Sequence, residues 1–145
     1  MSGAVIVSAA RTGVGSLGGS LASVPAAKLG EIVISAAIER AGLSEGDVDE
    51  TVMGHVLQAG QGQNTARQAS IGAGIANEKP AITINQVCGS GLRAVAMAAQ
   101  AVRLGDASVV VAGGHENMSL APHTAHLRDG VKMGPKNFTD TMITN

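Results

Sequence analysis

The single cysteine of the chain, Cys88, is the residue whose type and setting best suit nucleophilic chemistry. It lies in residues 85–92 (NQVCGSGL), between a predicted strand and a predicted helix. A turn from a strand into a helix holds a side chain at the mouth of a parallel sheet. The unpaired N–H groups at the start of a helix favour a thiolate and can bind a developing oxyanion. We weigh this nucleophile against an inert core cysteine, which is the common state of a free thiol.

Two glycines flank the cysteine and support the functional interpretation. Gly89 and Gly91 let the backbone turn sharply, and they allow a substrate to approach without a Cβ atom in the way. We therefore take Gly89 and Gly91 as candidate backbone support for an oxyanion.

A cysteine nucleophile usually needs a base, and the chain has four histidines. His115 follows the fourth predicted strand, so it is expected at the same sheet edge as Cys88 and is the best base candidate in this chain. His55 lies near the middle of the second predicted strand and is interpreted as a hydrogen-bonded core residue. His123 and His126 fall in the tail, where solvation or surface contacts are expected. The spacing of these residues predicts no metal site.

The elements that position these residues alternate along the chain. Apolar runs at residues 4–9, 51–57, 81–84 and 108–112 predict four strands, and helical spacing predicts helices at 25–41, 64–73 and 90–104. Gly42 and Gly105 are expected to end the first and third helices, Asn64 to cap the second, and Ser44 and Asp47 to cap one further turn. The order indicates an α/β fold with a parallel sheet and right-handed crossovers.

Two further segments have distinctive composition. Between Arg93 and Arg103 every residue except Gln100 is apolar, so this helix is expected to be buried on all sides and to need a second packed layer. Weakly hydrophobic alanines in contact with solvent are the alternative. Residues 115–145 show no sustained period, and they are interpreted as a loop or the opening of an inserted segment.

Composition excludes several classes of protein. The 145 residues have a formal net charge of −1 and only 1% aromatic side chains, which argues against nucleic-acid binding. The sequence lacks an apolar run long enough for a membrane span, and its N-terminus does not resemble a secretory signal. One cysteine cannot form an internal disulfide, which fits a reducing compartment. We expect a cytoplasmic protein that does not interact with membranes.

NQVCGSGLRAV closely resembles the nucleophile segment of the thiolases, in particular the biosynthetic type of acetyl-CoA acetyltransferases. VIVSAARTGVG, GQGQNTARQAS and VVVAGGHENMSLAPH also resemble thiolase segments, and they occur in thiolase order. The resemblance covers essentially the whole chain. It implies a thiolase-like N-terminal half, at residues 1–118, that forms one sheet layer of an αβαβα sandwich. Residues 119–145 would begin the loop and oligomerisation segment, with the family's cationic loop near residues 127–141.

The resemblance also implies an activity. Cys88 would take an acyl group from acyl-CoA as a thioester, which the carbanion of a second acetyl-CoA would attack to give acetoacetyl-CoA, reversibly. Coenzyme A thioesters would be substrates, and no separate cofactor is expected. Full-length members form tetramers, so a homo-oligomer is expected.

Departures from the family qualify these expectations. Thiolase chains are longer, and the activating histidine, the second cysteine, the asparagine that holds an oxyanion water and most of the CoA-binding surface have no counterpart here. We therefore expect the isolated chain to be inactive. His115 stands where thiolases commonly have Gln, which weakens its candidacy as a base. Two alternatives stay open: another condensing enzyme of the ketoacyl synthase kind, and a non-catalytic half-subunit that completes a sandwich with a partner.

Overall fold

A computed structural model describes residues 3–144. Residues 1–2 of the predicted N-terminal half (1–118) and residue 145 of the predicted loop segment (119–145) lie outside the described residues. Within this range a parallel sheet is formed by β1 (Glu50–Gly54), β2 (Ala81–Ile84) and β3 (Val110–Gly114), in the spatial order β2-β1-β3. The central strand β1 pairs Thr51 with Ala81 on one side and Glu50 with Val110 on the other. The predicted α/β class with a parallel sheet is confirmed.

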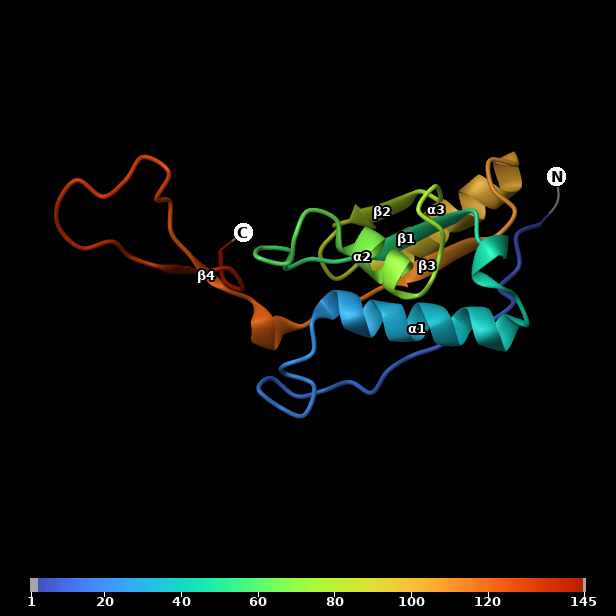
Figure 1. The fold of residues 1–145 in the computed structure, drawn as a ribbon, viewed down its shortest axis with the longest axis horizontal. Coiled ribbons are helices and arrows are strands. Elements are labelled where there is room, and N and C mark those ends of the chain that lie inside the picture. Colours follow the sequence, from blue (N-terminus) through green and yellow to red (C-terminus); the bar gives the residue numbers. More distant parts are fainter. Residues whose placement is uncertain (1–2, 145) are drawn as a thin grey trace.

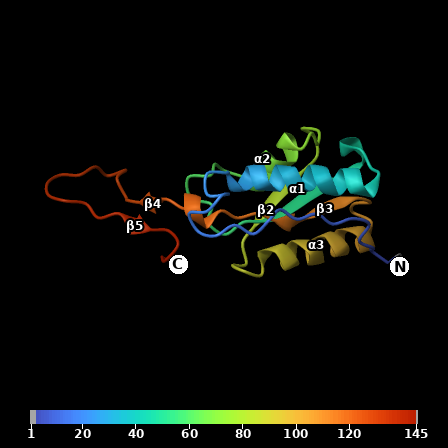
Figure 2. The same cartoon turned by 90° about the horizontal axis from the view of Figure 1, so that it is seen from below.

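Helices cover both faces of this sheet. α1 (Ala26–Ala41) and α2 (Thr65–Gly72) lie on one face, and α3 (Ser90–Leu104) lies on the other (Figures 1 and 2). Their ends follow the predicted caps: Gly42 adopts a left-handed φ of 68° after α1, and the Asn64 side chain accepts a hydrogen bond from the Arg67 N–H at the start of α2. In the short helix η1 (Glu45–Asp47), the N–H and hydroxyl of Ser44 both donate to the Asp47 carboxylate.

The main core lies between the sheet and the α1–α2 layer. Side chains of β1 alternate between the two faces, so Met53 joins this core while Gly54 contacts α3 on the opposite side. The buried members of the core are aliphatic or small: Ile34, Ile38, Val48, Met53, Ala66, Ala69, Ala73 and Ile75. Most of the buried apolar packing of the sheet is therefore on its α1–α2 face. The loops that follow the strands lie at the carboxyl edge of the sheet.

The strand predicted at residues 4–9 is not formed. This segment is extended but makes no ladder with β1, β2 or β3, and Val5 and Ile6 are each 80% exposed. The Ala9 carbonyl instead accepts a hydrogen bond from the Arg40 guanidinium at the end of α1. A branched apolar run becomes a strand only where a neighbouring strand supplies hydrogen bonds. The prediction considered the run alone and was wrong.

Two strand boundaries also differ from the prediction. β1 ends at Gly54 rather than residue 57, and β3 runs from Val110 to Gly114 rather than over 108–112. His55 therefore lies just beyond the end of β1, at the carboxyl edge of the sheet, and not near the middle of a strand.

Within the described residues α3 is covered on one side only, so the second layer expected from its apolar composition is not supplied by this part of the chain. Ala94 and Ala98 face the sheet and are buried, whereas Leu92 and Leu104 are more than three-quarters exposed. A single sheet layer can cover only one face of a helix. The outward face of α3 is therefore an apolar surface in contact with solvent.

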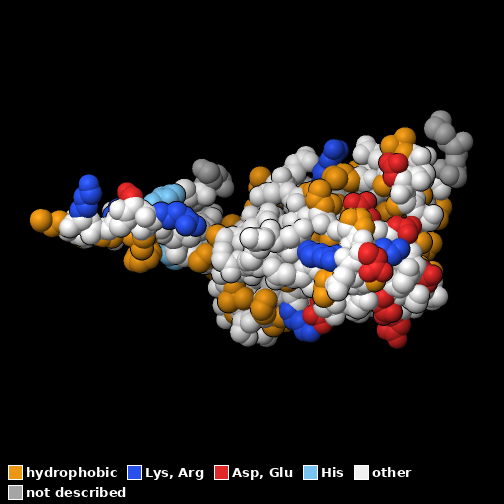
Figure 3. All heavy atoms as spheres, turned by 45° about the horizontal axis from the view of Figure 1, so that its top comes forward, with side chains coloured by type: hydrophobic (Ala, Val, Ile, Leu, Met, Phe, Trp, Pro, Cys, Tyr) orange, Lys and Arg blue, Asp and Glu red, His pale blue; other side chains and the backbone are white. Residues whose placement is uncertain are grey.

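Beyond the short helix η2 (Met118–Leu120) the chain leaves the α/β body as an arm. Its base is the antiparallel pair β4 (His123–Thr124) and β5 (Thr139–Asp140), and the residues between them form a long projecting loop (Figure 1). Basic and histidine side chains lie along the arm (Figure 3). Among the described residues, none of the helices is long and apolar enough to cross a membrane.

Candidate active site

Cys88 lies in the turn between β2 and α3, and its side chain is exposed. The turn is tight: the Gly89 N–H donates to the Gln86 carbonyl, and the Ser90 N–H donates to the Val87 carbonyl, each at 3.1 Å. Val87, the residue before the cysteine, has a φ of 49°. The predicted placement of the thiol at the amino end of this helix is what the structure shows. Its chemical role is not tested by that placement.

Two side chains that the sequence analysis did not single out hold this turn. Asn85 accepts a hydrogen bond from the Val87 N–H through its amide oxygen, at 2.9 Å. Ser90 donates its hydroxyl proton to the Val87 carbonyl at 2.6 Å and accepts from the Gln86 N–H at 2.8 Å. Asn and Ser on either side of a turn commonly bond to nearby backbone in this way, and that local pattern was the available signal.

The first turn of α3 sits directly on the ends of β1 and β3. A Cβ atom at Gly54 would lie 2.6 Å from the Cβ of Ser90, and one at Gly114 would lie 3.2 Å from the Gly54 carbonyl oxygen. The absence of a side chain at Gly54 therefore allows the helix to approach closely, while Gly114 avoids crowding against the neighbouring strand β1. The N–H of Gly89 is already used within the turn, while Gly91 packs over Gly113 and Gly114. The oxyanion role of both glycines stays a prediction.

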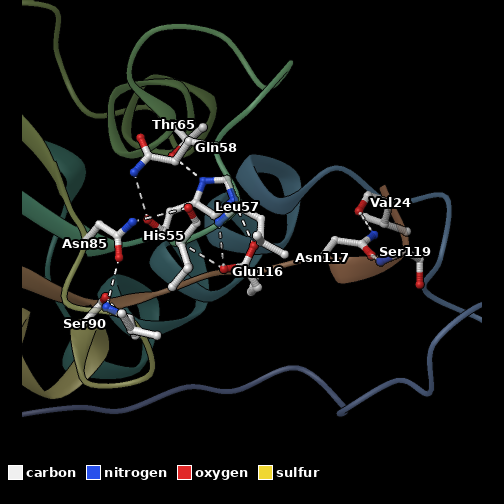
Figure 4. A network of polar contacts seen from close by, with 12 residues as sticks. Val24, His55, Leu57, Gln58, Thr65, Asn85, Ser90, Glu116, Asn117 and Ser119 are labelled. Atoms are coloured by element: carbon white, nitrogen blue, oxygen red, sulfur yellow. Dashed lines mark hydrogen bonds and ion pairs between the residues drawn. The ribbon is translucent and has the colours of Figure 1, made fainter. Parts of the chain in front are cut away.

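A buried polar cluster lies at the same edge of the sheet (Figure 4). His55 is 1% exposed, and its Nδ1 atom lies 2.8 Å from the Thr65 hydroxyl, as expected for a hydrogen-bonded core histidine. Its Nε2 atom is 3.1 Å from Glu116 Oε1, but the geometry of this contact is not that of a hydrogen bond. Glu116 Oε2 accepts from the N–H groups of Val56 at 2.9 Å and Leu57 at 3.3 Å.

Glu116 is the acidic residue of this cluster. Burial alone would raise the pKa of this carboxyl, but His55 and the N–H groups of Val56 and Leu57 outweigh burial and hold the pKa below its ordinary value. Glu116 therefore favours its carboxylate form, with Oε2 held by two backbone N–H groups and Oε1 beside the His55 ring.

His115 follows β3 at the predicted sheet edge but packs on the α1 side. Its ring is 5.0 Å from that of His55, and a Cβ atom at Gly30 of α1 would come within 2.3 Å of its Nδ1. Among residues 3–144, neither of its ring nitrogens has a hydrogen-bond partner. Burial, with the His55 charge second, lowers the pKa of His115 to about 4. Cys88 precedes α3, on the opposite face, and no hydrogen bond joins the two residues.

The remaining histidines lie on the arm, away from this edge. His123 is 4.0 Å from the Asp140 carboxylate across the β4–β5 pair, and His126 is exposed. Over residues 3–144 no three His, Cys, Asp or Glu side chains are grouped as metal ligands. A separate hollow of about 620 Å³ lies between residues 10–17, α1 and the segment after β3, and Cys88 does not line it.

Comparison with known proteins assigns the fold to a family. The family model described as "Thiolase, N-terminal domain" matches residues 4–145. The chain belongs to the thiolase family. It is 61% identical over 143 residues to an acetyl-CoA acetyltransferase of Paracoccus denitrificans. The aligned residues cover 99% of this chain and 37% of that protein. An acetyl-CoA acetyltransferase of Cupriavidus necator is 59% identical, over 100% of this chain and 37% of its own length.

A mammalian thiolase relative shows the same pattern. The protein named "Acetyl-CoA acetyltransferase, cytosolic" of Rattus norvegicus is 53% identical over 96% of this chain and 35% of its own length. The chain thus spans somewhat more than a third of these curated relatives. The thiolase resemblance noted in the sequence is confirmed.

Proposed function

We propose that this chain is the nucleophile-bearing part of an acetyl-CoA acetyltransferase. The observation that carries the proposal is an exposed cysteine, in a turn built by Asn85 and Ser90 at the start of a helix, within the thiolase family. The names of the relatives support acetyl-CoA as the substrate.

The Cys88 sulfur would attack the carbonyl carbon of acetyl-CoA. The bond between that carbon and the CoA sulfur breaks, the CoA thiolate leaves and takes up a proton, and an acetyl thioester forms on Cys88. A second acetyl-CoA, deprotonated at its methyl carbon, attacks this thioester, which yields acetoacetyl-CoA and returns the cysteine thiolate. No cofactor enters the scheme, because coenzyme A thioesters supply both reactants.

Proton transfer in this scheme is assigned to residues outside this chain. His115 packs against α1, has unpartnered ring nitrogens and is not bonded to Cys88, so it does not support the role of base. The thiolase resemblance implies a histidine and a second cysteine from a following half. We infer that this half covers the outward face of α3, that the assembled enzyme is a cytoplasmic homo-oligomer, and that the isolated chain lacks turnover.

A chimera tests the proposal. Residues 4–145 would replace the matching segment of the Paracoccus denitrificans relative, and acetoacetyl-CoA cleavage by CoA would be measured. We expect cleavage by the chimera, a loss of about a thousandfold or more on Cys88→Ser, and no cleavage by the isolated chain. A folded chimera without activity, or an active Cys88→Ser chimera, would contradict the proposal. A preference for acyl-carrier protein over CoA would favour the ketoacyl synthase alternative.

A further inference from the structure

The ends of β1 and β3 are tied together by one carboxylate, that of Glu116. Glu116 lies two residues beyond β3, and its side chain crosses to the segment that follows β1 (Figure 4). There Oε2 accepts from the N–H groups of Val56 and Leu57, and Oε1 lies 3.1 Å from His55 Nε2. One side chain therefore fixes three consecutive residues after the central strand.

The same segment is linked to the turn that carries the cysteine. The Val56 carbonyl accepts a hydrogen bond from the Asn85 side-chain amide at 3.4 Å, and the Asn85 amide oxygen accepts from the Val87 N–H at 2.9 Å. The Val56 carbonyl and the Leu57 N–H belong to one planar peptide group. Glu116 holds that peptide by its N–H, and Asn85 holds it by its oxygen. Rotation of this peptide would move the partner of Asn85 and release the side chain that restrains Val87.

Thr65 completes the arrangement from the α2 side. Its hydroxyl lies 2.8 Å from His55 Nδ1, and His55 Nε2 lies 3.1 Å from Glu116 Oε1, so the imidazole is packed between the start of α2 and Glu116. His55 is 1% exposed, so bulk solvent does not reach the ring. The carboxylate is thus held in one orientation by a buried ring on one side and by two backbone N–H groups on the other.

We propose that Glu116 is a positioning residue for Cys88, acting through the Val56–Leu57 peptide and Asn85. The proposal deepens the function proposed above and rests on the role of Cys88 as nucleophile. Glu116 touches neither the thiol nor a substrate. It fixes the turn that keeps the sulfur at the amino end of α3, where the helix N–H groups increase the reactivity of a thiol.

The test measures alkylation of Cys88 in the full 145-residue chain. Iodoacetamide is the probe, intact mass follows the modification, and urea unfolding follows stability. We expect Glu116→Ala to slow alkylation by about threefold or more, because the released turn no longer fixes the sulfur. Glu116→Gln should restore the rate to within about twofold, because its amide oxygen can accept from the same backbone N–H groups.

Asn117→Ala is the matched control. Asn117 is the neighbouring residue, and its side-chain amide donates to the carbonyls of Leu21, Ala22 and Val24, far from the turn in sequence (Figure 4). We expect this variant to lose stability without a change in the alkylation rate. Equal slowing in Asn117→Ala and Glu116→Ala, or an unchanged rate in Glu116→Ala, would overturn the proposal.

The acyl-transfer function proposed for Cys88 and the positioning role proposed for Glu116 are tested by different experiments. A chimera that shows no cleavage of acetoacetyl-CoA would remove the acyl-transfer role, whatever the alkylation rates are. If Glu116→Ala itself does not fold, the Glu116→Gln and Asn85→Ala variants decide. Asn85→Ala removes the next link and should slow alkylation as Glu116→Ala would, while Glu116→Gln should not. An unchanged rate in Asn85→Ala would overturn the proposal.

Discussion

Val87 occupies a backbone conformation that β-branched residues rarely adopt, immediately before the cysteine. Its φ of 49° falls in the left-handed region, which costs an L-residue about 1–2 kcal/mol. Its side chain is 61% exposed, so packing does little to offset this cost. The side chains of Asn85 and Ser90 hold the two polar backbone groups of Val87 instead. Backbone strain of this kind is common at functional sites, where a side chain must hold a particular orientation.

Replacing Val87 by a residue that tolerates this conformation should stabilise the chain. Asn adopts the left-handed region more readily than Val, so Val87→Asn is expected to raise the free energy of unfolding by up to about 1 kcal/mol. Urea unfolding followed by circular dichroism measures the change. Val87→Ile keeps the branched Cβ and should leave stability unchanged. A Val87→Asn variant that is less stable than the parent would show that the conformation carries no strain.

His115 makes stability depend on pH. Its pKa is about 4 in the folded chain, against an ordinary 6.5, so between these values the unfolded chain binds a proton that the folded chain does not. Stability should therefore fall as pH decreases from 6.5 to 4, by up to about 3 kcal/mol. Glu116, whose pKa is also lowered, adds a loss at the acid end of this range. Urea unfolding at a series of pH values measures the slope.

His115→Met should remove most of that slope, because an apolar side chain of similar length fills the site without a group that must stay neutral. The variant should also be more stable at pH 5, since no buried ring nitrogen is left without a partner. His126→Gln, which changes an exposed histidine on the arm, serves as the control and should keep the parental slope. An equal slope in His115→Met would assign the pH dependence to other groups.

The position of Cys88 could be predicted from the sequence, but its link to residues far away in the chain could not. The turn around Cys88 could be predicted because Gly89, Ser90 and the adjoining strand and helix are neighbours in sequence. The contacts of Glu116 could not, because they lie about sixty residues away, at Val56 and Leu57. His115 was placed at the right edge, but only the packing of α1 decides which face its ring takes.

At the scale of elements, α3 and the sheet are in contact without an intervening side chain at Gly54 and Gly114. The glycine at the end of β1 lies under Ser90, and the one at the end of β3 lies under Gly91. Close approach of backbone to backbone leaves no flexible atoms that could move aside. The position of the first turn of α3, and with it that of Cys88, therefore depends on the absence of a methyl group at Gly54.

Gly54→Ala should displace α3. The added methyl would lie 2.6 Å from Ser90 Cβ and 2.8 Å from the Ser90 carbonyl carbon, so the helix backbone must shift. We expect a loss of about 1–3 kcal/mol in the free energy of unfolding, with slower alkylation of Cys88. Differential scanning calorimetry and mass spectrometry provide the two measurements. Gly13→Ala is the control, because nothing lies within 4 Å of its added Cβ; equal effects in both variants would exclude the contact as the cause.

The elements that could be predicted are those whose signals are local. α1, α3 and β2 match their predicted ranges to within a residue, because Gly42, Gly105 and the apolar run of β2 mark their ends. The run at residues 4–9 has the same branched composition as a strand, yet no strand among the described residues pairs with it. Strand formation depends on a neighbour elsewhere in the chain, and no local pattern contains that information.

At the scale of the whole molecule, the α/β body and the arm are stabilised separately. The arm is closed by pairing of His123 with Asp140 and of Thr124 with Thr139, and the Thr141 N–H and hydroxyl both donate to the Pro122 carbonyl. These hydrogen bonds are internal to the arm. The tip of the arm carries exposed apolar side chains, among them Met133 and Phe138, and contributes nothing to the core.

Shortening the arm should leave the body intact. Because β4 and β5 are antiparallel neighbours, an Asn-Gly turn can join Thr124 to Thr139 in place of residues 125–138. We expect the urea midpoint of the body to stay the same, with a change of less than about 0.5 kcal/mol in stability. A larger loss would show that the arm supports the core. Gln68→Ala, which breaks the contact of α2 with the Gln61 carbonyl, should by contrast lower the midpoint.

The central place of β1 in the sheet determines when the cysteine turn can be completed during synthesis. Both strands that pair with β1 come later in the chain, and the last group to restrain the segment after it is a carboxylate two residues past β3. On a ribosome the thiol emerges before that carboxylate does. The nascent cysteine therefore passes through an interval in which its turn is incomplete, and the time of folding is governed by pairing between distant parts of the chain.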